Sequence, residues 1–236
     1  MFALDDDAAQ SLQARRDVVG AQYGIRREAV ADRDAAAIDR LLVQVITGWY
    51  PKSPIPMPVP ESHNAIVQYS VNVTTLVRDR KLFETHHRYL FFPTFDGAEY
   101  VAISSATSDP PIAEGNVIVK TKSVARGWLH QFWFPSPLRR GQQYELQFRV
   151  LGDPDDEYWL TEEGLAFHEP TRFASFQVIF VGATPATIWK YTGLTSVERP
   201  GEPNKSSALG YEQNGRVHAD FRDLYGGLFH GIAWAW

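Results

Sequence analysis

The sequence predicts a mainly β protein, an antiparallel β-sandwich that carries an N-terminal α-helical appendage. Three observations predict this class. From residue 64 onward, short segments alternate apolar and polar residues, which is typical of strands with one buried face. Residues 1–49 instead place apolar residues at helical spacing. Residues 50–61 contain five prolines and therefore cannot form a central strand.

The N-terminal appendage is predicted to form two helices. Acidic residues 5–7 place negative charge where a helix N-terminus is stabilised by it, and the first helix ends at Gly20 or Gly24. A second helix begins at Asp32 or Asp34. It carries a single apolar stripe, formed by Ile38, Leu41, Leu42, Val45 and Ile46.

Two interpretations of this appendage stay open. Helices with one apolar stripe pack against the edge of a sandwich, or they dock onto a partner protein. The Pro-rich residues 50–61 are expected to form a semi-rigid connector. The predicted organisation is therefore a helical appendage at 1–49, the connector, and a β-sandwich domain at 62–236.

The predicted strands of the sandwich domain follow one another through turns of Gly, Pro and charged residues. Residues 65–77 and 81–92 are expected to form a hairpin around Arg78-Asp79-Arg80. Residues 172–182 form a strong strand, and 187–194 is its expected partner. Further strands are expected at 99–108, 116–125, 128–134, 144–150, 216–221 and 231–236.

One turn gives the sandwich its predicted type. Pro135-Ser136-Pro137 marks a turn, because proline fixes φ and removes a backbone donor. Leu138, Gly141 and Tyr144 then follow with the spacing L-x-x-G-x-x-Y, which resembles the tyrosine corner of immunoglobulin-like sandwiches. There the tyrosine hydroxyl bonds to backbone a few residues upstream. Residues 224–236 partly repeat this pattern, so one large sandwich, which we prefer, and two half-domains both remain open.

Composition excludes several classes of function. The chain has no cysteine, so disulfides, thiolate metal sites and cysteine nucleophiles are absent. A net charge of -5 argues against direct nucleic-acid binding through a global positive field. The acidic start is unlike a secretory signal, and no run of about 18 apolar residues occurs, so a soluble cytoplasmic protein without membrane contact is expected.

The same pattern search gives no cofactor and no metal site. Neither of the common glycine-rich phosphate loops is present. His86 and His87 are neighbours on a strand and point to opposite faces, so they cannot chelate together. His168 is followed by Glu169-Pro170, which breaks the helical zinc motif. Only convergence of His86 or His87 with His130 and His168 would indicate a metal site.

Three residues are the candidate ligand contacts: Trp159, His168 and Trp236. The two tryptophans lie near a loop and the chain end, where aromatic rings stack on sugars or anchor a protein interface. The acidic loop at 153–157 lacks the spacing of a calcium loop and is expected to be solvated. No catalytic residue is assigned.

A resemblance rests on three stretches: PLRRGQQYELQF, HEPTRFASFQVIFVGATPATIWKY and the closing GLFHGIAWAW. Together they resemble a β-rich C-terminal domain of actinobacterial helix-turn-helix regulators and signalling proteins, over residues 64–236. The resemblance implies a sensing or interaction domain with no catalytic residues to carry over. No helix-turn-helix is recognisable in this chain.

The main hypothesis is a non-enzymatic regulatory or signalling module that binds a partner protein or a small ligand. The partner would bind residues 1–49 or a face of the sandwich. The first alternative is a carbohydrate-binding module that uses exposed tryptophan. The second is an enzyme with a histidine- and carboxylate-lined pocket inside the sandwich, which clustered histidines in the structure would favour.

Overall fold

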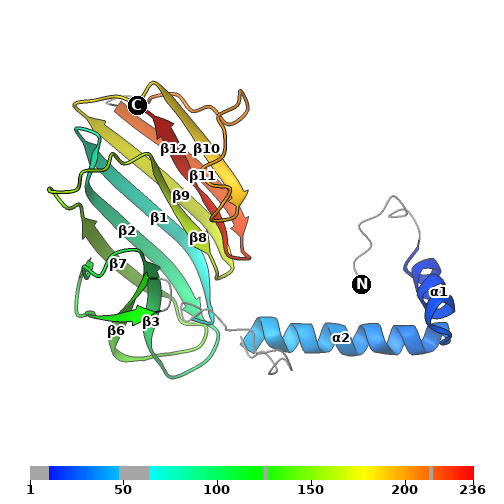
Figure 1. The fold of residues 1–236 in the computed structure, drawn as a ribbon. Helices are drawn as coiled ribbons and strands as arrows, with labels where there is room; N and C mark the ends of the chain where they lie inside the picture. The colour runs from blue at the N-terminus through cyan, green and yellow to red at the C-terminus, as the bar shows by residue number, and fades with distance from the viewer. Residues whose placement is uncertain (1–10, 48–63, 125–126, 213–214) are drawn as a thin grey trace. The chain divides into compact units, whose positions relative to one another are not determined.

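The computed structural model describes residues 11–47, 64–124, 127–212 and 215–236 (Figure 1). The chain divides into two compact units, residues 1–56 and 57–236. The predicted Pro-rich connector at 50–61 lies outside the described residues. Neither of the described helices is long and apolar enough to cross a membrane.

The described part of the N-terminal unit forms two helices, α1 (Leu12–Tyr23) and α2 (Arg27–Thr47). The α1 helix begins where Ser11 Oγ accepts a hydrogen bond from Ala14 N–H at 3.2 Å, a typical N-cap. It ends at Gly24, one of the two predicted positions, because Gly24 adopts the left-handed conformation of a C-cap.

The second helix starts earlier than predicted. The sequence placed its start at Asp32 or Asp34, but Val30 N–H already donates to Arg26 C=O at 3.2 Å. The tight turn after α1 therefore leads directly into α2, and the acidic residues lie inside the helix instead of capping it. Within the predicted apolar stripe, Ile38 is 62% exposed, and the other four side chains lie outside the described ones.

The described residues of the larger unit form three sheets. One has six strands in the order β11-β9-β1-β2-β7-β4, and two have three strands in the orders β10-β12-β8 and β3-β6-β5. The strands are β1 (Ile66–Arg78), β2 (Lys81–Pro93), β3 (Ala98–Ser105), β4 (Ile112–Ala113), β5 (Ile118–Val124), β6 (Gly127–Leu138), β7 (Tyr144–Leu151), β8 (Glu162–Phe167), β9 (Thr171–Val181), β10 (Thr187–Leu194), β11 (Arg216–Leu224) and β12 (Leu228–Ala235).

This architecture confirms the predicted mainly β sandwich with a small N-terminal helical part. One pair of strands differs from an antiparallel arrangement, since β1 runs parallel to β9. The long stretch from β2 to β8 lies between them in sequence and supplies the crossover that parallel neighbours need. The remaining named pairs are antiparallel.

Both small sheets cover the same face of the six-stranded sheet. Phe176, Val73, His87 and Phe148 form one buried row across β9, β1, β2 and β7, because each is the register partner of the next. Phe132 of β6 packs on Phe148, with ring centroids 4.7 Å apart. At the other end of the row, Phe167 of β8 packs edge-on against Phe176, with centroids 6.4 Å apart. The core thus lies between one wide layer and two narrow ones.

The predicted corner has the expected hydrogen bond. Tyr144 Oη accepts from Arg139 N–H at 2.9 Å, Leu138 is buried, and Gly141 takes a positive φ of 68°. The turn itself lies later than Pro135-Ser136-Pro137, because β6 extends to Leu138. The prolines instead lie in an irregular part of β6, where its register with β3 shifts and ladder donors are not needed.

The hairpin around Arg78-Asp79-Arg80 is present, with positive φ at Asp79 and Arg80. One strand pairing was wrong. Residues 187–194 form β10, which pairs with β12 and not with the strand that precedes it, β9. Chain order favours sequential partners, but β10 crosses to the second layer, where Trp189 and Tyr191 pack on Ala233 of β12.

Candidate functional site

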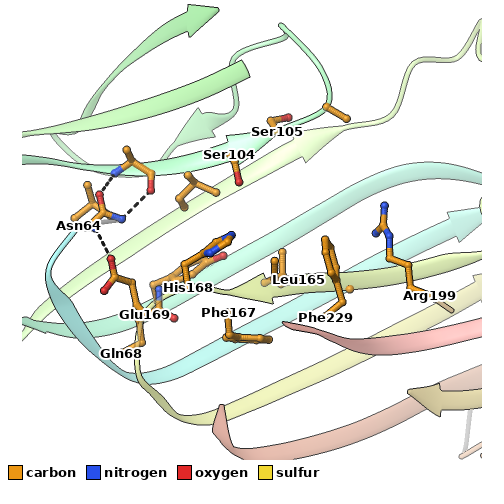
Figure 2. A pocket seen from close by; sticks show the side chains of 17 residues that line it. Asn64, Gln68, Ser104, Ser105, Leu165, Phe167, His168, Glu169, Arg199 and Phe229 are labelled. Carbon is orange, nitrogen blue, oxygen red and sulfur yellow. Dashed lines mark hydrogen bonds between the residues drawn. The ribbon is translucent and has the colours of Figure 1, made fainter. Parts of the chain in front are cut away.

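A cleft of about 400 Å³ opens in the layer that the two three-stranded sheets form. Its two walls are β3 and β8, each of which is the last strand of its three-stranded sheet. Its floor comes from the six-stranded sheet below, through Gln68 and Tyr89. A cleft of this volume is within the range of small-ligand sites. Figure 2 shows its lining residues.

One end of the cleft is closed by Asn64, which precedes β1. The Asn64 side-chain carbonyl accepts from Ala102 N–H at 2.6 Å, and its amide donates to Ala102 C=O at 2.9 Å. These are the two bonds that a neighbouring strand would make to Ala102. The side chain therefore takes the place of one strand residue beside β3.

The same asparagine connects β3 to the segment that follows β8. Asn64 N–H donates to the Glu169 carboxylate, which is 4% exposed. The Glu169 backbone carbonyl accepts from the hydroxyl of buried Thr171 at 3.0 Å, and that hydroxyl also contacts Gln68 at 2.7 Å. Polar groups thus hold both walls to the floor at this end.

A cation lies at the other end of the cleft. Arg199 stacks on the Phe229 ring, with its guanidinium carbon 4.4 Å from the centroid, and Nη1 lies 3.6 Å from Glu162 Oε1. The Trp189 indole N–H donates to Pro200 C=O at 3.0 Å and thereby fixes the loop that carries the arginine. Figure 2 shows Arg199 and Phe229 at the end opposite Asn64.

The floor and lower walls of the cleft are mainly apolar. Val101 and Phe167 are buried, and the Tyr89 ring stacks on Phe148 with centroids 5.8 Å apart. Burial, and then the nearby Glu163 carboxylate, raise the pKa of the Tyr89 hydroxyl, so it stays neutral. A ligand side chain that points into the sandwich would therefore meet an uncharged surface.

Beneath β8 lies a buried carboxyl group, Glu163. Its Oε2 accepts from Thr75 Oγ1 at 2.8 Å and lies 3.4 Å from Thr85 Oγ1. Burial raises the pKa of Glu163 to about 7, although these hydroxyl contacts oppose the shift. The group links β8 to β1 and β2 below the cleft.

The groups that line this cleft are suited to binding a ligand. A nucleophilic site needs a hydroxyl held by a general base. Ser105 Oγ accepts from Thr107 N–H at 3.1 Å, and in the described part of the chain no hydrogen bond joins His168 to Ser104 or Ser105. The cleft instead offers a cation, hydroxyls and an apolar floor, which suit an amphipathic ligand with a negative group.

The three predicted ligand contacts do not form one site. His168 lines the cleft, beside Gly227 at the start of β12. Trp159 and Trp236 lie at the other end of β12, where both rings face the Arg80 guanidinium at 4.5 and 5.8 Å. The sequence therefore identified one residue of the cleft and two residues of a separate cation–π cluster.

The histidines also remain apart. His87 lies in the core, stacked on Phe148 at 4.5 Å, and His130 bonds to Thr121 at 2.9 Å. Among the residues that the structure describes, no three acidic or histidine side chains are close enough to hold a metal ion. The arrangement that would have favoured the metal-dependent interpretation does not occur there.

Sequence analysis missed most of the cleft. Asn64, Ser104 and Arg199 belong to no motif, and each lies at an element boundary or in a loop. The only local signal was His168-Glu169, which was examined as a zinc motif. Because the cleft exists only where two distant sheet edges meet, no local pattern could have indicated it.

No family model and no curated protein sequence matches the chain. Among solved structures, it is similar to an M1 zinc metallopeptidase from Deinococcus radiodurans, with a TM-score of 0.44 and 12% identity over 76% of this chain and 44% of that chain. It is also similar to a mutant of a two-domain M1 zinc metallopeptidase bound to L-arginine, with a TM-score of 0.43 and 14% identity over 73% and 43%. The chain thus spans less than half the length of these enzymes, and such distant similarity carries no functional conclusion.

Proposed function

We propose that the protein is a non-enzymatic binding module of a regulatory or signalling system, and that the cleft between β3 and β8 is its binding site. The proposal agrees with the resemblance to the C-terminal domains of actinobacterial regulators. The bound group would be a small ligand, or a segment of a partner protein, that carries a negative charge.

The observation that carries this proposal is the cleft itself. It has an apolar floor, and Arg199 stands at one end with a partly exposed guanidinium. Pockets that combine apolar walls with a few oriented polar groups are the usual ligand sites of proteins. The Arg199 guanidinium has further N–H groups beyond its contact with Glu162, and these suit a carboxylate.

The carbohydrate-binding alternative has less support. Trp159 is 55% exposed, but one face of its ring is covered by the guanidinium of Arg80. The Trp236 ring packs edge-on against Phe180 and donates its N–H to Leu160 C=O at 2.8 Å. Flat, open rings that could stack on a sugar are therefore not available as a pair.

A fragment screen tests the proposal. The full chain, labelled with ¹⁵N, is titrated with small aromatic and aliphatic carboxylates, and backbone amide shifts are followed. We expect shifts at Ser104, Ala166 and Phe229, with dissociation constants at or below about 1 mM. Matched uncharged amides should bind more weakly, because Arg199 would lose its charged partner.

Two substitutions of the same kind provide the control. Ser104→Trp places a bulky ring at the exposed wall of the cleft, and Ser123→Trp places it at an exposed position of β5, at the far edge of the same sheet. Binding should be lost only in Ser104→Trp. Equal binding in both variants, or shifts confined to other surfaces, would contradict the proposal.

A further inference from the structure

We propose that the cleft binds the C-terminal end of an extended peptide, which adds as a strand between β3 and β8. This inference rests on the proposed function and names its ligand class. The bound peptide would join the β10-β12-β8 and β3-β6-β5 sheets into one continuous layer. Strand addition of this kind uses backbone hydrogen bonds for affinity and side-chain pockets for specificity.

Asn64 provides the first argument, because the protein already fills part of the gap in this way. Its side-chain amide gives Ala102 both of the hydrogen bonds that a paired strand residue would give. This shows that the outward edge of β3 accepts a strand-like partner at this point. A peptide would continue from Asn64 along the same edge.

The next outward-facing residue of β3 is Ser104. In an antiparallel ladder, alternate residues direct both backbone groups to the same side. Because Ala102 bonds outward to Asn64, Ser104 also directs its N–H and C=O away from β6 and into the cleft. Its side chain is exposed, and Figure 2 shows it on the cleft wall across from His168.

The opposite wall presents a matching edge. Trp234 N–H donates to Thr161 C=O at 2.8 Å, so Thr161 faces β12 and even-numbered residues of β8 face the cleft. Gly164 directs its N–H to the Glu163 carboxylate. Ala166, whose side chain is small, therefore remains as the main pairing position on this wall.

The volume of the cleft sets the length of the occupant. One residue of an extended strand inside a layered sheet takes about 160 Å³, from a rise of about 3.3 Å, a strand spacing of about 4.8 Å and a sheet separation of about 10 Å. A cleft of about 400 Å³ therefore holds two to three residues. A chain end fits this length better than the middle of a longer strand.

The charge of Arg199 determines in which direction the peptide runs and which of its two ends lies in the cleft. Asn64 closes one end of the cleft and Arg199 stands at the other. A peptide that starts beside Asn64 would place its terminal carboxylate at the guanidinium, where a charge-assisted hydrogen bond forms. The penultimate side chain, which would point to the floor at Tyr89 and Phe167, should be apolar.

The test uses a pool of N-acetylated tripeptides of Val, Leu, Thr and Ser, each as the free acid and as the C-terminal amide. Hydrogen exchange of the ¹⁵N-labelled full chain is measured with and without peptide. We expect the acids to protect the amides of Ser104 and Ala166 at least tenfold. The amides should bind at least tenfold more weakly, and Arg199→Gln should remove that difference.

Two controls separate backbone pairing from side-chain contact. Ser104→Pro removes the backbone donor, whereas Ser104→Ala removes only the hydroxyl, so binding should be lost in the first variant and kept in the second. Because proline also changes the backbone of β3, a second experiment removes a hydrogen-bond donor from the peptide instead of from the protein. N-methylation of the central peptide amide should weaken binding at least tenfold to the unaltered protein.

The outcomes distinguish this inference from the proposed function. If carboxylate fragments bind the cleft but no tripeptide does at about 1 mM, the peptide proposal is overturned and the binding site stands. The same holds if tripeptides bind without protecting Ser104 and Ala166, or if N-methylation has no effect. If neither fragments nor peptides bind in a Ser104→Trp-sensitive manner, both proposals are overturned.

Discussion

The two ends of β12 differ in how they use aromatic and charged side chains. At its C-terminal end, Trp234 and Trp236 both donate to Leu160 C=O at 2.8 Å, and Arg80 lies against Trp159. At its N-terminal end, the neighbouring wall of β8 faces an open cleft. At the C-terminal end these side chains already make their contacts within the chain, whereas the N-terminal end borders an open cleft.

This difference shows why aromatic content alone does not locate a binding site. Trp159 and Trp236, near Arg80, were the conspicuous residues in the sequence, but the Trp236 N–H and one face of the Trp159 ring are occupied. The described residues that line the cleft include no tryptophan, and they offer unpaired strand edges and a cation instead. Strand edges whose backbone N–H and C=O groups have no hydrogen-bond partner in the fold are the better indication of a site.

The largest effect on stability is expected at the C-terminal end of β12. Trp234 is 1% exposed and packs edge-on against Phe180 at 5.1 Å. Trp234→Ala should lower the free energy of unfolding by about 3–5 kcal/mol, as large core truncations do. Ser104→Ala in the cleft should change it by less than about 0.5 kcal/mol. Urea denaturation measures both, and similar losses would contradict the contrast between the two ends.

The next prediction concerns His87, which lies in the core of the sandwich. Burial, with a smaller effect of His86, lowers the pKa of His87 to about 3, and its Nδ1 has no hydrogen-bond partner among the described residues. The unfolded chain takes up a proton near pH 6.5 and the folded protein does not. Stability is therefore lost as the pH falls from about 6.5 towards 3.

Replacing this ring removes the acid sensitivity. His87→Phe keeps the stacking on Phe148 and should make the protein more stable than the wild type by about 3 kcal/mol at pH 4. At pH 8 the difference in stability should shrink to the cost of burying the His87 Nδ1 atom without a hydrogen-bond partner. Unfolding measured at both pH values checks this, and an equal pH dependence in both proteins would refute the buried neutral state.

Glu163, beneath β8, should show the opposite dependence. Its pKa is raised to about 7, above the unfolded value near 4.5, so stability is full below about pH 4.5 and is lost as the pH rises through 7. Glu163→Gln should thus gain about 1–3 kcal/mol relative to the wild type at pH 8 and almost nothing at pH 4. Glu162→Gln, on the neighbouring position, is the control and should not reproduce this profile.

A smaller effect than at Trp234, His87 or Glu163 is expected at the cation–π cluster. Arg80→Ala should cost about 0.5–1 kcal/mol, since Trp159 is largely exposed. Iodide should quench the fluorescence of the variant more strongly, because the second face of the Trp159 ring opens. Ligand binding in the cleft should not change, and a loss of binding would show that the two ends are coupled.

The sequence predicted the local parts of this fold. Alternation located most strands, and the spacing of Leu138, Gly141 and Tyr144 located the corner, because each depends on neighbouring residues. The parallel pairing of β1 with β9 and the pairing of β10 with β12 depend on distant segments, and no local pattern encodes them. The cleft depends on the same distant pairings, so of its residues only His168 was anticipated.

The most direct test of the open end is hydrogen exchange at Ser104 and Ala166 in the full chain with an acetylated tripeptide acid. The account predicts at least tenfold slower exchange at both amides, lost when the central peptide amide is N-methylated. Binding with unchanged exchange at both positions would contradict it, since the ligand would then occupy the cleft without completing the sheet.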